Sequence, residues 1–183
     1  MGHEDRELAR RCREGDTAAY TELMRRHRRM VFGIVYAILG CPEEAEDVAQ
    51  EAFVRAYRAI GRYDPRFAFA TWVRRIAVNR AISRLKGRER TREVERAAGR
   101  LTVTREEEPE EHVVAGDLTQ RVRAAIETLP TNQRVAITLF GLEGMTLAET
   151  AEAIGCSVGA VKSHLHRARG KLADQLSDHL TGD

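Results

Sequence analysis

The sequence predicts an all-α protein made of two small helical domains joined by a flexible linker. Aromatic residues make up only 5% of its 183 residues, four are proline, and Ala, Leu, Arg and Glu dominate, which favours helix over sheet. Apolar residues recur at three- and four-residue spacing before about residue 87 and again after residue 117. The stretch between them is strongly charged and holds few large apolar side chains, as solvated linkers do.

The charge distribution supports this division. The net charge is +2, but residues 1–90 carry 19 Lys and Arg against 13 Asp and Glu. Residues 91–120 carry four against eight, and residues 121–183 carry seven against seven. We therefore assign residues 1–90 to a first domain, 91–116 to the linker, and the remainder from 117 to 183 to a second domain.

The first domain is predicted to be a bundle of three or four helices. After a short N-terminal helix, Asp16 caps a long helix that Gly40 stops. Pro42 opens the next helix, at a position where its missing N–H costs nothing. A loop over residues 61–67 separates it from a third helix, which we expect from about residue 69 to residue 86.

The second domain ends in a pattern of two short helices. Thr146 and Glu149 have the spacing of a capping box, which predicts a helix over 147–154. Gly155 ends that helix and Ser157 caps the last one. Two short helices joined by a glycine turn are typical of a helix-turn-helix.

The last helix has one apolar side and one cationic side. Val158, Val161 and Leu165 are predicted to be buried, and no acidic residue lies between Ala153 and Lys171. Small residues at a helix start admit base edges, and cations further along suit phosphates. The residues that this assignment turns outward are Ser157, Gly159, Ala160, Lys162, Ser163, His166, Arg167 and Arg169. The competing interpretation is an ordinary surface helix whose cations are solvated.

Cations and aromatic residues also alternate in the first domain. Between Arg66 and Arg88 the sequence has seven cations and no acid. Aromatic rings that stack on bases beside cations that hold the backbone suit single-stranded DNA. Tyr63 and Phe67, in the predicted loop, are the candidates for base contact, whereas Trp72 has the helical spacing of a core residue.

The helix before this basic stretch has the opposite character. Asp47, Gln50 and Glu51 follow its first turn at i, i+3 and i+4, so they share one face. A carboxylate face on a basic domain indicates a basic protein partner. A solvated surface explains the same pattern equally well.

Two segments resemble a known family. "EAEDVAQEAFVRAYRAI" with "FATWVRRIAVNRAISRLKGR" resembles region 2, and "LPTNQRVAITLFGLEGMTLAETAEAIGCSVGAVKSHLHRARGKL" resembles region 4, of the extracytoplasmic-function sigma factors, a sigma-70-family group of bacterial RNA polymerase subunits. The resemblance implies that the first domain is region 2 and the second is region 4. It implies core RNA polymerase, promoter DNA and an anti-sigma factor as partners, and promoter-specific transcription initiation as the function.

The resemblance also assigns roles to residues. It implies that Asp47, Gln50 and Glu51 contact the clamp of the polymerase β′ subunit and that region 4 packs on the β-subunit flap. The residues expected at the −10 element are Tyr63, Arg66, Phe67, Arg75, Asn79, Arg80, Ser83 and Arg84. The residues expected at the −35 element are Ser157, Val158, Gly159, Ala160, Lys162, Ser163, His164, His166, Arg167 and Arg169. The acidic run at 106–111 is expected to enter the polymerase channel.

Other function classes fit less well. A stand-alone helix-turn-helix regulator, the main alternative, leaves the first domain without a role. The sequence has no nucleotide-binding glycine loop and no metal-ligand spacing, so we expect no catalytic residues, cofactor or metal. Its three cysteines are dispersed, its N-terminus is charged, and its longest apolar run, residues 30–41, is too short to span a bilayer. These features predict a cytoplasmic protein without membrane insertion.

Overall fold

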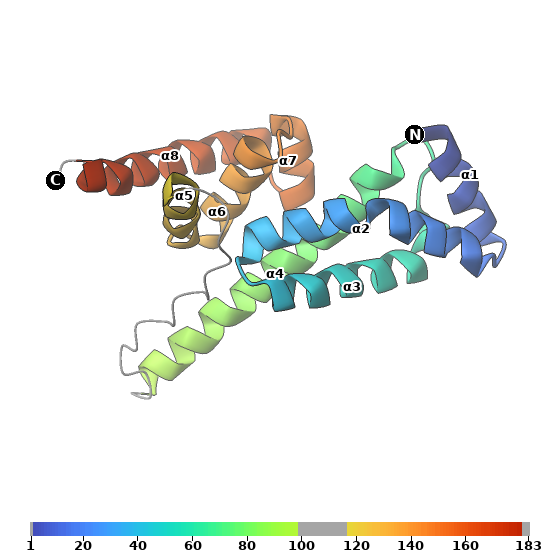
Figure 1. Ribbon diagram of the computed structural model, residues 1–183, viewed down its shortest axis with the longest axis horizontal. Coiled ribbons are helices and arrows are strands. Elements are labelled where there is room, and N and C mark those ends of the chain that lie inside the picture. The colour runs from blue at the N-terminus through green and yellow to red at the C-terminus, as the bar shows by residue number, and fades with distance from the viewer. Residues whose placement is uncertain (1, 99–116, 181–183) are drawn as a thin grey trace.

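The computed structural model describes residues 2–98 and 117–180, and over these residues its regular structure is helical. The first part consists of α1 (Gly2–Arg13), α2 (Thr17–Leu39), α3 (Pro42–Arg58), the 3₁₀ turn η1 (Ile60–Arg62) and α4 (Phe69–Ala97). The second part consists of α5 (Asp117–Glu127), α6 (Thr131–Ile137), the π-helical turn η2 (Thr138–Leu142), α7 (Leu147–Ile154) and α8 (Val158–Leu180). Figure 1 shows the two parts side by side, and the all-α prediction is confirmed.

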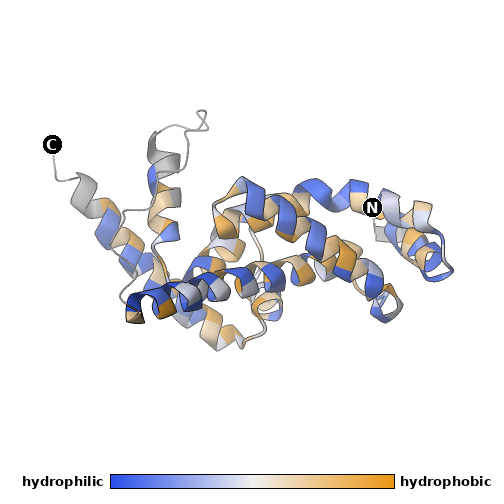
Figure 2. Cartoon of the chain, turned by 90° about the horizontal axis from the view of Figure 1, so that it is seen from below, coloured by the Kyte–Doolittle hydropathy of each residue, from blue (hydrophilic) through white to orange (hydrophobic). Residues whose placement is uncertain are grey.

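The first part is a bundle in which α2, α3 and α4 pack against one another and α1 packs on α2. The predicted boundaries of α2 are confirmed: the Asp16 carboxylate accepts a hydrogen bond from the Ala19 backbone N–H at 3.0 Å, and Gly40 ends the helix at φ +79°. Hydrophilic and hydrophobic residues alternate along the helices (Figure 2). The side chains that fill the core include Leu23, Ile34, Ile38, Val48 and Val73.

Helix α4 is longer than predicted. We expected it to end near Lys86, but it continues through Gly87 to Ala97, so the first seven residues of the predicted linker are helical. The Arg, Glu and Ala residues beyond Gly87 have high helix propensity, which outweighs a single glycine. The rest of the linker, with the acidic run at 106–111, lies outside the described residues.

The second part contains the predicted helix-turn-helix. The Thr146 hydroxyl and the Glu149 carboxylate form both hydrogen bonds of the capping box, and Gly155 ends α7 at φ +77°. The Ser157 hydroxyl accepts a hydrogen bond from the Ala160 N–H at 3.2 Å, as its capping role predicts. Val161 and Leu165 are buried, but Val158 is 39% exposed, because it lies in the first turn of α8. The predicted burial of Val158 is therefore wrong.

The two parts share an apolar interface. Helices α6 and α7 pack on α4, and η2 packs on α2. Val135, Leu139, Met145 and Ala153 of the second part belong to the same core cluster as the first bundle. The charge pattern gave no sign of this packing. No helix within the described residues is long and apolar enough to cross a membrane.

Candidate nucleic-acid interface

The first turns of α8 form a continuous outward surface. The buried Val161, Leu165 and Ala168 fix the inner side of the helix against α6 and α7. The exposed residues of the predicted set are Ser157, Val158, Gly159, Lys162, Ser163, His166, Arg167 and Arg169. The other two, Ala160 and His164, are half-buried. All ten side chains or backbone positions predicted for the −35 element therefore reach the surface of α8.

This surface combines small residues with exposed cations. Its start has the partial positive charge of a helix N-terminus and leaves backbone and hydroxyl groups accessible. Lys162 and Arg167 lie beyond that start and are exposed, as phosphate contacts require. The guanidinium carbon of Arg169 lies 5.9 Å from the centroid of the Phe140 ring, a cation–π arrangement that holds this side chain against η2.

The loop before α4 corrects one expectation. Tyr63 was predicted to stack on bases, but its ring is 2% exposed and packs against Phe69 and Trp72, with centroids 5.6 and 5.2 Å away. Burial raises the pKa of the Tyr63 phenol, and its hydroxyl donates to the Phe67 carbonyl at 2.7 Å. Tyr63 therefore supports the loop from inside. Phe67 is 57% exposed, so it remains the aromatic candidate for base contact.

An Asp–Arg pair shapes the same loop. The Asp64 carboxylate accepts hydrogen bonds from the backbone N–H of Arg66 at 2.9 Å and from its guanidinium at 2.6 Å. The Arg66 hydrogen bonds lower the pKa of Asp64, which stays ionised. This turn places the exposed side chains of Arg66 and Phe67 next to each other at the surface.

The predicted −10 residues of α4 fall into two groups. Asn79 and Ser83 are exposed one turn apart, and the Ser83 hydroxyl donates to the Asn79 carbonyl at 2.8 Å. The arginines are instead engaged within the chain. Arg75 pairs with Glu152 of α7, and both Arg80 and Arg84 pair with Glu51 of α3.

The predicted polymerase-binding residues lie on the face of α3 beside these arginines. Asp47 and Gln50 are exposed, and Glu51 is half-buried. The hydrogen bond from Arg80 lowers the pKa of Glu51, so this carboxylate is ionised. Val54 lies on the same face and is 49% exposed. The charge pattern of the sequence did not indicate this exposed apolar side chain.

Comparison with known proteins identifies both parts. Residues 23–91 match the family model "Sigma-70 region 2", and residues 119–172 match "Sigma-70, region 4". The chain is 33% identical to the RNA polymerase sigma-H factor of Pseudomonas aeruginosa, over 97% of this chain and 96% of that protein. It is 35% identical to the ECF RNA polymerase sigma-E factor of Escherichia coli, over 94% of each. Among solved structures it is similar to CnrH bound to the cytosolic domain of CnrY, with 28% identity, a TM-score of 0.65, and coverage of 96% of this chain and 98% of that one.

Proposed function

This chain belongs to the extracytoplasmic-function (ECF) group of sigma-70-family RNA polymerase sigma factors. We propose that it uses three separate surfaces, one for the −35 element, one for the −10 element and one for the polymerase. It binds core RNA polymerase and directs transcription initiation at specific promoters, and it contributes no catalytic group of its own. The observation that supports this most directly is the pairing of a region 2 bundle with a region 4 helix-turn-helix in one chain. A stand-alone regulator would have no use for the first bundle.

The first surface is the start of α8, which enters the major groove at the −35 element. Ser157, Gly159 and Ala160 are small enough for the helix start to approach base edges. Lys162 and Arg167 contact the flanking phosphates and contribute affinity that depends on salt. His164, half-buried beside Leu165, is a further phosphate contact.

The second surface reads the −10 element after strand separation. Phe67 stacks on an unpaired base, while Arg66 next to it contacts the backbone. Asn79 and Ser83 are exposed one turn apart on α4. The Asn79 side-chain amide donates a hydrogen bond to the same strand, and the Ser83 hydroxyl, which already donates to the Asn79 carbonyl, accepts one. Tyr63 acts through Phe67, because its hydroxyl holds the backbone of that residue.

The third surface is the acidic face of α3, which contacts the β′ clamp. Asp47 and Gln50 are exposed at its centre, and Val54 adds an apolar contact on the same face. Charge complementarity there selects a basic partner and speeds association.

The packed arrangement represents the chain before it binds a promoter. The −35 and −10 elements are separated by about 25 base pairs of promoter DNA. At about 3.4 Å per base pair, this separation is about 85 Å along the duplex. Region 4 packs on α4 here, and its Glu152 forms an ion pair with Arg75 of that helix. The two parts therefore separate on promoter binding. An anti-sigma factor that binds this packed form would keep the chain inactive. The similar protein CnrH was solved in complex with the cytosolic domain of CnrY.

The polymerase contact is tested with Asp47→Arg. Its binding to core RNA polymerase should fall at least tenfold in a pull-down or a fluorescence titration, because the substitution reverses the charge at the centre of the α3 face. Glu143→Arg is the matched control, since Glu143 is an exposed acid in the second part. Equal binding by Asp47→Arg and the unchanged chain would remove α3 from the polymerase interface.

A further inference from the structure

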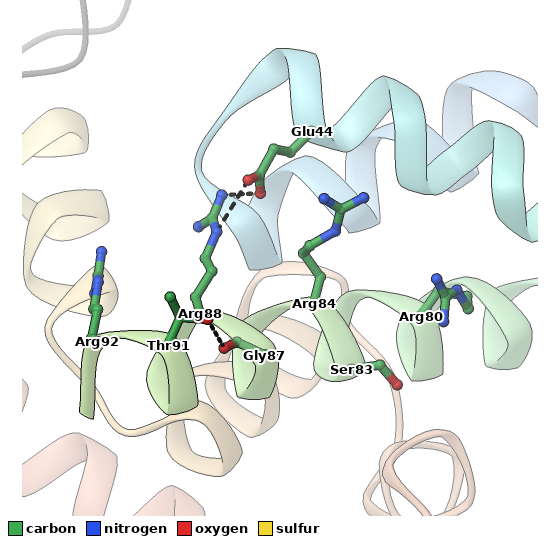
Figure 3. A pocket seen from close by; sticks show the side chains of 8 residues that line it. All are labelled: Glu44, Arg80, Ser83, Arg84, Gly87, Arg88, Thr91 and Arg92. Carbon is green, nitrogen blue, oxygen red and sulfur yellow. Dashed lines mark hydrogen bonds and ion pairs between the residues drawn. The ribbon is translucent and has the colours of Figure 1, made fainter. Parts of the chain in front are cut away.

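One face of α4 carries an arginine at every fourth position: Arg80, Arg84, Arg88 and Arg92. Four residues of α-helix rise about 6 Å and make slightly more than one turn, so the four side chains leave the same side of the helix. We call this set the arginine ladder. Figure 3 shows it along an open depression whose other lining residues are Glu44, Ser83, Gly87 and Thr91.

Two carboxylates of α3 pair with three of the four arginines. The Glu51 carboxylate lies 2.9 Å from Arg80 Nε and 3.7 Å from Arg84 Nη2. The Glu44 carboxylate lies 3.2 Å from Arg88 Nε. Among the described residues, the four arginines therefore face two paired carboxylates, so the depression has an excess of positive charge. Such a surface attracts an anion.

Gly87 lies at the centre of the ladder without a packing reason to be glycine. It is within the helix, and a Cβ added there would meet no other atom within 4 Å. Glycine is unfavourable inside a helix, because it loses more backbone entropy than other residues. The missing side chain leaves room for the backbone of a ligand to approach α4.

The length and shape of the depression favour a polymeric anion. Its cations span more than three helical turns, and its described lining has no aromatic or aliphatic side chain that would hold a small organic molecule. Regularly spaced guanidinium groups with hydroxyls between them suit consecutive phosphates of a nucleic acid. A bound phosphate would replace Glu44 as the partner of Arg88, which that carboxylate already holds in position.

The position of the ladder along the chain identifies which DNA it meets. It starts at Arg80, next to Asn79 of the proposed −10 surface, and continues toward the C-terminal end of α4, away from the loop at 61–67. The chain then leads to region 4, which reads the −35 element upstream. We propose that Arg88 and Arg92 extend the DNA-binding surface onto the duplex between the two elements, where they bind phosphates without reading sequence. This inference rests on the proposed function.

The test measures how holoenzyme binds two DNA probes at several salt concentrations. The first probe is a forked promoter with duplex upstream of the −10 element, and the second is a −10 oligonucleotide without that duplex. Arg88→Ala with Arg92→Ala should weaken binding to the fork about tenfold and reduce its salt slope by about 1.8, since each phosphate contact contributes about 0.9. Binding to the oligonucleotide should not change.

Control variants separate charge from structure. Arg90→Ala, on a different face of the same helix, should leave both probes unaffected, and Arg88→Lys with Arg92→Lys should retain most of the salt slope. Gly87→Glu adds a negative charge where the chain has open space, so it should weaken binding to the fork even if the double alanine variant fails to fold.

Three results would overturn the inference: an unchanged salt slope on the fork, an equal loss with Arg90→Ala, or loss of core polymerase binding by the double alanine variant. The last would make the ladder a protein contact instead. If either of the first two results appears while the holoenzyme still initiates normally, the ladder is rejected and the proposed function is left intact.

Discussion

The guanidinium group of Arg75 on α4 lies 3.2 Å from the carboxylate of Glu152 on α7, measured from Nη1 to Oε1. This ion pair joins the helix proposed to contact the −10 element to the first helix of the helix-turn-helix. Both side chains are 53% exposed, so the pair itself adds little stability. The shared apolar interface around Leu139 and Met145 contributes more to the packing of the two parts.

Glu152→Arg should favour separation of the two parts, because it places two cations where an ion pair stood. The free protein should then bind a −10 oligonucleotide up to about fivefold more tightly, the limit set by an exposed pair of about 1 kcal/mol. Fluorescence anisotropy checks this, with Glu143→Arg as the control. Weaker binding by the Glu152 variant would contradict a masking role for the pair.

Phe67→Ala should reduce promoter opening several-fold with little effect on folding, since the ring is exposed and available for stacking. Permanganate footprinting of holoenzyme on promoter DNA measures the opening. Tyr63→Phe is the companion variant: it deletes the hydrogen bond to the Phe67 carbonyl and should lower the free energy of unfolding by about 1 kcal/mol. Full opening by Phe67→Ala would exclude base stacking by this ring.

Lys162→Ala or Arg167→Ala should weaken binding to −35 duplex and reduce the magnitude of the salt slope by about 0.9 for each lost phosphate contact. The loss should be similar on different duplex sequences, because phosphate contacts do not distinguish bases. Titrations at four or more salt concentrations give the slope. A slope equal to that of the unchanged chain would mean that these cations are solvated.

Thr150→Val should raise the free energy of unfolding by about 1 kcal/mol. Thr150 is fully buried in α7, and its hydroxyl has no hydrogen-bond partner among the described residues, so a methyl group of similar size removes an unpaired polar atom. Thr146→Ala, which removes the helix cap, should lower stability by about the same amount. Chemical denaturation of both variants measures the difference, and a less stable Thr150→Val would disprove the account of this site.

Stability should fall in acid partly through Glu149. Hydrogen bonds from the backbone and hydroxyl of Thr146 lower the pKa of this carboxyl in the folded state. Its contribution is therefore complete above the unfolded-state value of about 4.3 and is lost as the pH falls through the lower folded-state value. Glu149→Gln should flatten the plot of unfolding free energy against pH in this range. An identical plot for the variant would mean that the Glu149 carboxyl does not contribute to the pH dependence.

Local features of the fold were predictable from the sequence, because they depend on neighbours along the chain. The Asp16 cap, the capping box at Thr146 and the turn at Gly155 each follow from a few adjacent residues. The inner side of α8 followed from helical spacing, except at Val158 in the first turn, which is 39% exposed.

Features that depend on distant contacts were not predictable. Tyr63 looks like an exposed loop residue until α4 folds back and places Phe69 and Trp72 around it. The pairing of Arg80 with Glu51 depends on the register between α3 and α4, which periodicity does not specify. Helix α4 passes Gly87 because no residue there forces a turn, so composition alone placed its end too early.

Transcription in vitro with purified core RNA polymerase tests the central claim most directly. The account predicts that adding this chain starts transcripts at one defined position on a promoter with matching −10 and −35 elements, and that deleting either element abolishes them. No defined start with any template, while the chain still binds duplex DNA through α8, would contradict promoter recognition by two separate surfaces. It would leave only a helix-turn-helix that binds DNA.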